Sequence, residues 1–296
     1  MRSLGFFLFA CIVFALPPNG FPAMQESKDE LLIAGEESPG IQARQLRQIY
    51  PEIRASVENA LGWKLLSPPT VVLIANREVF EKMSGSPFFS AFAVPSRHSI
   101  IINISSPTSE PYILHETLEH ELCHLLLHQH IQDRLLPKWL DEGICQWVSG
   151  SFGEILAGKG VAAVRINPAS HPIPLRELVV SFPRDQDSLI QAYAESRLFV
   201  EYLVARYGKE SLLRVLQHLR EGMPIDQAIS IATSKSLQNL ENEWLEELRS
   251  KDMWLLWASR NLYELLFLLA AILSIVAFVR VMIRKKRYDP DEEDEE

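Results

Sequence analysis

ILHETLEHELCHLLLHQH, residues 113–130, is the most informative segment of the chain. Its leucine and isoleucine residues surround a polar centre at helical spacing, which predicts a buried helix over residues 112–130. Within it, His120, Glu121 and His124 form the pattern HExxH. Residues four apart on a helix share a face and lie about 6 Å apart along its axis, so both imidazoles can reach one tetrahedral metal ion.

Glu121 follows His120 directly and points about 100° away from it around the helix. Its carboxylate is therefore expected beside the metal ion, where it can accept a proton from an activated water molecule as a general base. Charged side chains inside an apolar helix are costly unless something compensates them. A bound metal ion would do so.

A metal site of this kind needs a third protein ligand, and two residues compete for that place. His130 lies six residues after His124, but Leu127 stands midway where a helix break would be needed. His130 is then about 9 Å further along the same helix and out of reach. Glu142, in PKWLDEGICQWVSG on the next expected helix, is the better candidate. Its neighbour Asp141 is expected either to cap that helix or to support a ligand histidine.

The remaining sequence between residues 43 and 253 predicts an α+β fold, with a small mixed sheet followed by a helical half. Residues 70–74 and 98–105 are rich in β-branched residues and predict strands. Apolar periodicity and Gly or Pro punctuation predict helices at 43–60, 77–83, 112–130, 136–149, 187–207, 209–221, 224–233 and 236–250. We expect residues 43–253 to form one domain, preceded by a polar linker at 24–42.

The two ends of the chain are apolar and predict a membrane topology. Residues 1–23 have the layout of a signal peptide, with Arg2, an apolar run and then prolines. Residues 262–283 are expected to form one transmembrane helix, followed by a basic and then acidic tail at 284–296. The positive-inside rule places that tail in the cytoplasm and the domain outside it, in the periplasm or at the cell surface.

Composition narrows the function classes further. The 296 residues are 47% hydrophobic and 23% charged, which excludes wholesale disorder. The net charge of −9 leaves no basic face, so we expect no nucleic-acid partner. Cys123 and Cys145 lie three residues after the proposed ligands His120 and Glu142. They are expected either to form a disulfide or to pack as two thiols, and the thiols are favoured.

The motifs HELCH and WLDEGICQWV together resemble the gluzincin metallopeptidases, most closely the peptidase-MA-like group, and more distantly the M1 aminopeptidases with their WLNEGFA motif. This resemblance implies a zincin-like domain, a Zn²⁺ ion held by His120, His124 and Glu142, and Glu121 as the catalytic base. Within QAYAESRLFVEYLVARYG, Tyr193 matches a tyrosine that stabilises the oxyanion, although it is equally consistent with a packed core residue.

The chain also departs from the aminopeptidases, because HSIIINIS at 98–105 has nothing like the GAMEN segment that holds a substrate amine. This strand either pairs with an extended peptide at the sheet edge or serves only as a core strand. We therefore predict a membrane-anchored zinc metallopeptidase acting on peptides or proteins outside the cytoplasm. The alternatives are a non-catalytic zincin-scaffold binding module at the membrane and a zinc hydrolase with a non-peptide substrate.

Overall fold

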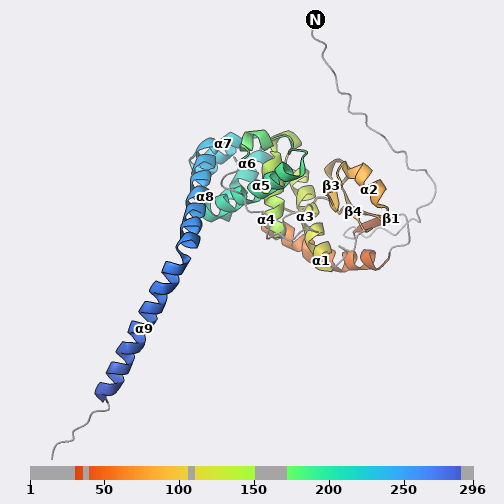
Figure 1. Cartoon of the computed structure of the whole chain (residues 1–296). Helices are drawn as coiled ribbons and strands as arrows, with labels where there is room; N and C mark the ends of the chain where they lie inside the picture. Colours follow the sequence, from red (N-terminus) through yellow and green to blue (C-terminus); the bar gives the residue numbers. More distant parts are fainter. Residues whose placement is uncertain (1–30, 36–39, 106–110, 151–171, 288–296) are drawn as a thin grey trace, which may run out of the picture. The chain divides into compact units, whose positions relative to one another are not determined.

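The computed structural model describes residues 31–35, 40–105, 111–150 and 172–287 (Figure 1). The expected signal peptide, and residues 288–296 of the expected tail, lie outside the described residues. The described chain is a mixed α/β domain in which a small sheet precedes most of the helices, as the sequence predicts.

The sheet has four strands in the order β1-β2-β4-β3. Its members are β1 Leu32–Gly35, β2 Thr70–Ile74, β3 Ala91–Val94 and β4 Ser99–Asn103. The strands β1, β2 and β4 run parallel, and β3 is antiparallel to β4. Because β4 has a neighbour on each side, the strand that we considered as a peptide-binding edge is internal. Among the described strands, the two edges of the sheet are β3 and β1, and β1 lies inside the expected linker.

The helices over the described residues follow the predicted periodicity closely. They are α1 Ile41–Leu61, α2 Arg77–Ser84, α3 Pro111–His130, α4 Lys138–Ser149, α5 Gln186–Tyr207, α6 Lys209–Arg220, α7 Ile225–Thr233, α8 Leu237–Arg260 and α9 Leu262–Arg287. Short 3-10 turns form η1 Pro95–Arg97, η2 Asp133–Leu135 and η5 Leu175–Leu178. Among these helices, α8 extends ten residues beyond its expected end at 250.

The helix α3 runs through the middle of the core. Its leucines, Leu118, Leu122, Leu125, Leu126 and Leu127, are almost completely buried. It packs against α1 and α4 and also contacts β3, β4 and η1. A smaller apolar cluster around Phe80 of α2, Ile74 and Ile101 forms separately from this main core. The HExxH segment is therefore fixed by apolar contacts from both the sheet and the helical half.

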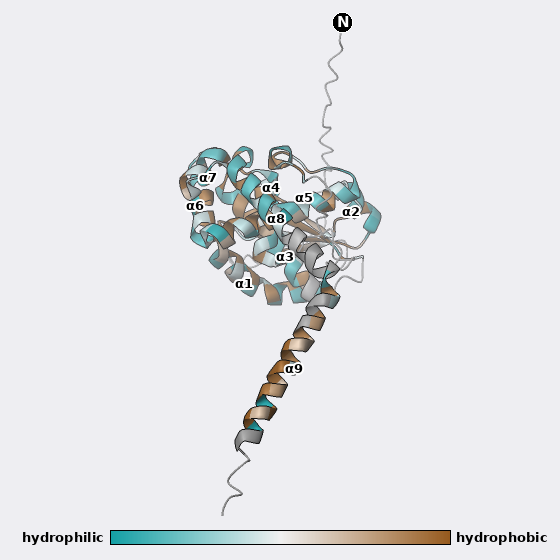
Figure 2. Ribbon diagram, turned by 60° about the vertical axis from the view of Figure 1, so that its left-hand side comes forward, coloured by the Kyte–Doolittle hydropathy of each residue, from teal (hydrophilic) through white to brown (hydrophobic). Residues whose placement is uncertain are grey.

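The prediction of a transmembrane helix at 262–283 is wrong: among the residues that the structure describes, no helix is both long and apolar enough to span a bilayer. Residues 262–283 do form part of α9, whose described side chains are mostly apolar and exposed (Figure 2). However, the uncharged run between Glu264 and Arg280 has 15 residues, or about 22 Å of helix. The hydrocarbon core of a bilayer is about 30 Å thick.

Candidate metal site and catalytic cavity

The structure brings together the three residues that the sequence proposes as metal ligands. One ligand atom from each of His120, His124 and Glu142 lies within 4.8 Å of the other two. The Nε2 atoms of the two histidines are 3.1 Å apart, and Glu142 Oε2 lies 3.4 Å from one and 3.5 Å from the other. The chain turns between α3 and α4 at η2, so that α4 packs back against α3. His130 instead contacts the backbone oxygen of Lys64, away from this cluster.

The three side chains have the chemistry that a divalent metal ion requires. All are buried, and Glu142 Oε2 has no hydrogen-bond partner among the residues that the structure describes. A buried carboxylate oxygen without a donor is costly, but a cation between it and the two imidazoles would compensate it. Two histidines and one glutamate are a ligand set used by catalytic zinc, which leaves one position open. The residues therefore fit a metal ion, although the donor set alone does not identify which one.

Electrostatics at the cluster also favour a positive charge. Burial lowers the pKa of His124, but the carboxylates of Asp141 and Glu142 outweigh it and raise that pKa well above its usual value. Burial alone would raise the pKa of Glu142, yet Lys138 and His124 hold it well below its usual range. These shifts show that Asp141 and Glu142 make the surroundings of His124 electrostatically negative.

Asp141 contacts a candidate ligand histidine, which agrees with one of the two roles expected for it. Its Oδ1 lies 2.7 Å from His124 Nδ1. The helix cap of α4 is instead Pro137. With Nδ1 donating to Asp141, the lone pair of His124 Nε2 faces the other two ligands. The imidazole of His128 bridges Asp141 at 3.2 Å and Asp133 at 2.7 Å.

His128 has a place in this network that the sequence interpretation missed. The signal was present, because His128 lies four residues after His124 and so continues the same helical face. Burial opposes its protonation, but hydrogen bonds with Asp141 and Asp133 raise the pKa of His128 above its usual value.

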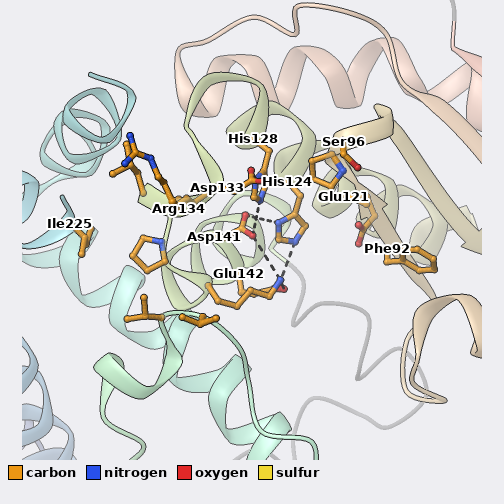
Figure 3. Close-up of a pocket in the computed structure, with 18 of the residues that line it drawn as sticks. Phe92, Ser96, Glu121, His124, His128, Asp133, Arg134, Asp141, Glu142 and Ile225 are labelled. Atoms are coloured by element: carbon orange, nitrogen blue, oxygen red, sulfur yellow. Dashed lines mark hydrogen bonds and ion pairs between the residues drawn. The ribbon is translucent and has the colours of Figure 1, made fainter. Parts of the chain in front are cut away.

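Glu121 lies beside the three candidate ligands, as its place on the helix predicts. Its side chain is buried and lines the same cavity (Figure 3), and within the described part of the chain its Oε1 has no hydrogen-bond partner. A carboxylate with an unengaged oxygen next to a metal site is suitably placed to accept a proton from water. Its role as a base is a proposal, developed below.

Tyr193 faces the candidate site from α5. Its hydroxyl donates a hydrogen bond of 3.2 Å to Glu142 Oε1, and its ring lines the cavity and meets Phe182 edge-on at 5.0 Å. This close approach of α5 to α4 depends on Gly143, because a Cβ atom there would collide with the backbone oxygen of Ser196. Tyr193 is therefore buried but directed at the site.

Cys123 and Cys145 form a disulfide, so the favoured expectation of two free thiols is wrong and its alternative is correct. The packing of α3 on α4 brings their Cα atoms to 5.4 Å, within the range that a disulfide spans. Both residues are completely buried. The bond joins the helix that carries both histidines to the helix that carries Glu142.

A cavity of about 730 Å³ lies over the cluster. One wall comes from Phe92 and Ala93 of the edge strand β3 with Ser96 of η1, and the other from Val179, Val180 and the start of α7. Figure 3 shows Phe92 and Ser96 on one side of the cluster and Ile225 on the other. The sequence interpretation missed this wall, because AFAV at 91–94 is too short to predict a strand.

Comparison with known families agrees with this geometry. A family model described as the Peptidase MA superfamily matches residues 81–250, a segment that contains α3, α4 and α5. No curated protein matches the chain, and the expected resemblance to M1 aminopeptidases finds no support. On the strength of a match that covers more than half of its length and all the residues of the candidate site, the chain belongs to the Peptidase MA superfamily.

Proposed function

We propose that this chain is a zinc-dependent peptidase of the HExxH type. The observation that carries the proposal is the convergence of His120, His124 and Glu142, with Glu121 beside them, in one cavity. Membership of the Peptidase MA superfamily supports peptidase-like activity in general. A two-histidine, one-glutamate donor set favours zinc among the biological metals.

In this proposal, His120, His124 and Glu142 would hold a zinc ion, which would supply an acidified water molecule and polarisation of the scissile carbonyl group when bound. Glu121 accepts the proton of the attacking water with its unengaged oxygen and delivers it to the leaving amine. Tyr193, whose hydroxyl lies beside Glu142, donates a hydrogen bond to the oxygen of the scissile carbonyl as it becomes negative. Asp141 keeps the ring of His124 in the orientation that exposes Nε2.

The edge strand β3 supports a peptide as the substrate. Of the strands that the structure describes, β3 pairs with β4 alone, and its residues Phe92 and Ala93 line the cavity. An extended peptide can add to such an edge through backbone hydrogen bonds while its side chains enter the neighbouring apolar wall. A peptide or an unfolded protein segment fits this arrangement.

We further propose that the domain acts outside the cytoplasm. A buried disulfide forms and persists in oxidising compartments, and the sequence predicts a signal peptide ahead of the domain. Both observations support the periplasm or the cell surface.

The test begins with metal analysis of the purified full chain, alongside His120→Ala and Glu121→Gln variants. We expect about one zinc per chain in the wild type and in Glu121→Gln, and little in His120→Ala. Incubation with a peptide mixture, read by mass spectrometry, should show cleavage only by the wild type. A chelator should abolish it, and zinc should restore it.

Two outcomes would contradict the proposal in different ways. Full zinc occupancy without cleavage of any peptide would favour the binding module or a hydrolase with another substrate. Cleavage that is unchanged in Glu121→Gln, or that survives complete zinc removal, would refute the assigned chemistry.

A further inference from the structure

Lys138 makes an ion pair with a candidate metal ligand inside the cavity. Its Nζ lies 2.6 Å from Glu142 Oε1, one helical turn along α4, and 3.9 Å from Asp141 Oδ2. The Lys138 side chain is 38% exposed and lines the cavity, whereas Glu142 is buried. This ion pair therefore lies at the wall of the cavity, with Glu142 buried and Lys138 partly open to solvent.

The two oxygens of Glu142 face different partners. Oε1 accepts hydrogen bonds from Lys138 and Tyr193, while Oε2 faces the imidazoles of His120 and His124 and has no hydrogen-bond donor among the described residues. A carboxylate whose first oxygen is occupied by an ammonium group can offer only the second oxygen to a metal ion. Lys138 thus selects which oxygen of Glu142 is available.

The charge of Lys138 also acts on any cation held by Oε2. Two positive charges a few ångströms apart in a partly buried site repel each other strongly, because the dielectric screening there is much weaker than in water. Lys138 in addition draws electron density away from the carboxylate through a short, charge-assisted hydrogen bond. A ligand that donates less leaves its metal ion more electrophilic.

We propose that Lys138 is a positioning residue that restricts Glu142 to one ligand oxygen and, by its positive charge, weakens metal binding in exchange for a stronger Lewis acid. This inference rests on the proposed function. In this arrangement the positive charge of Lys138 limits the affinity of the site for its metal ion. Removing the cation should tighten metal binding while it slows catalysis, whereas removing an ordinary structural support would weaken both.

The decisive variants are Lys138→Met, which removes the charge and the donor, Lys138→Gln, which keeps a donor without charge, and Lys138→Arg, which keeps both. Dissociation constants for Zn²⁺ are measured on the full chain by competition with a chromogenic chelator. We expect the Kd to fall at least tenfold in Lys138→Met and Lys138→Gln and to stay within about threefold of the wild type in Lys138→Arg. The kcat of the zinc-loaded Met and Gln variants should fall, and Arg should restore it.

Two controls separate the charge from other effects. Tyr193→Phe removes the neutral donor to the same Glu142 oxygen, so the Kd for Zn²⁺ should change by less than about threefold. Lys64→Met removes an ion pair of the same 2.6 Å length, with Glu58, that lies outside the residues lining the cavity. It should leave the Kd unchanged. Thermal unfolding of the metal-free proteins shows whether each variant remains folded.

The results distinguish failure of this inference from failure of the proposed function. Weaker zinc binding in folded Lys138→Met, or an effect on KM alone with unchanged Kd, would overturn the role given to Lys138. A wild type that binds no zinc would instead overturn the proposed function itself. Tighter binding in Lys138→Met but not in Lys138→Gln would refute the part played by charge.

Discussion

Glu142 and Glu195 are both buried glutamates on helices of the helical half, but their partners differ in kind. Glu142 meets the ammonium group of Lys138 and two imidazoles. Glu195 accepts hydrogen bonds from the amide of Gln191 at 2.7 Å and from the backbone N–H of Ile173 at 3.0 Å. Burial would raise the pKa of both. Cationic neighbours reverse that effect at Glu142, whereas the pKa of Glu195 rises to about 7.

Glu142, Lys138, His120 and His124 form one group, the Glu142 cluster. Glu195 and Glu241 form another, the Glu195 cluster, and both of its acids accept hydrogen bonds from backbone N–H groups. Glu241 of α8 accepts a hydrogen bond of 2.8 Å from Leu175 N–H, close to where Glu195 holds Ile173. These contacts anchor the segment that leads to Val179, whose oxygen accepts the N–H of Lys138 and whose side chain lines the cavity. A buried acid therefore does not by itself indicate a metal site. The charge of its donors distinguishes the two uses.

The same substitution at these two positions should affect zinc affinity differently. Glu142→Gln removes a candidate ligand oxygen, and we expect zinc affinity to fall by more than the 10- to 100-fold typical of losing a residue that only orients a ligand. Glu195→Gln should leave zinc affinity unchanged, because Glu195 contacts none of the candidate ligands. Chelator competition on both variants measures the difference. Equal losses would remove the distinction between the two clusters.

The disulfide joins the two helices that carry the Glu142 cluster, and neither cysteine lies on the helices of the Glu195 cluster. A Cys123→Ala, Cys145→Ala double variant should lose about 3 kcal/mol of unfolding free energy, because the bond closes a loop of 22 residues. Urea unfolding measures this loss. Zinc affinity should fall as well, since α3 and α4 are then held by packing alone. Peptide mapping without reductant must find the two cysteines linked in the wild type, and two free thiols would exclude the bond.

Substitution of Asp141 tests whether the orientation of the His124 ring affects zinc binding. Asp141→Asn preserves the shape of the side chain but removes the charge that fixes Nδ1–H of His124, so zinc should bind about 10- to 100-fold more weakly. His128→Gln, which keeps a donor toward Asp141, should cost less. A larger effect at His128 than at Asp141 would show that the network is organised from its outer end.

The sequence predicted the candidate site better than its surroundings. HExxH and Glu142 follow from helical spacing and from a short connection, and both are local rules that tertiary context did not override. The roles of these residues remain predictions. Strand β3 was missed because four residues carry too little periodicity. Lys138 was missed because a lysine in the first turn of a helix is usually exposed, and only the packing of α4 places it at the cavity.

Long-range contacts explain the other differences. The preference for free thiols came from the offsets of Cys123 and Cys145 along the chain, whereas the distance between two helices decides whether a disulfide forms. The transmembrane prediction counted apolar residues over 262–283 and gave too little weight to the charges that bound the run. Glu195 gave no signal, because its partners Gln191 and Ile173 look like ordinary surface and loop residues in the sequence.

The pKa of Glu195 makes the stability of the folded protein depend on pH. Its folded pKa of about 7 lies above the ordinary value of 4.5, mainly because of burial and secondarily because of Glu241. The folded state therefore binds more protons than the unfolded state between these two values. The stabilising contribution is complete below about pH 4.5 and is lost as pH rises through about 7.

Glu195→Gln should remove this dependence while it keeps hydrogen bonding to Ile173. Relative to the wild type, we expect the variant to gain about 3 kcal/mol of unfolding free energy at pH 8 and little at pH 4.5. Urea unfolding across that range, with Glu243→Gln as an exposed control, measures the difference. A gain that does not change with pH would mean that Glu195 is not the titrating group. If Glu195→Gln also changed the affinity for zinc, the Glu195 cluster and the Glu142 cluster would be energetically coupled.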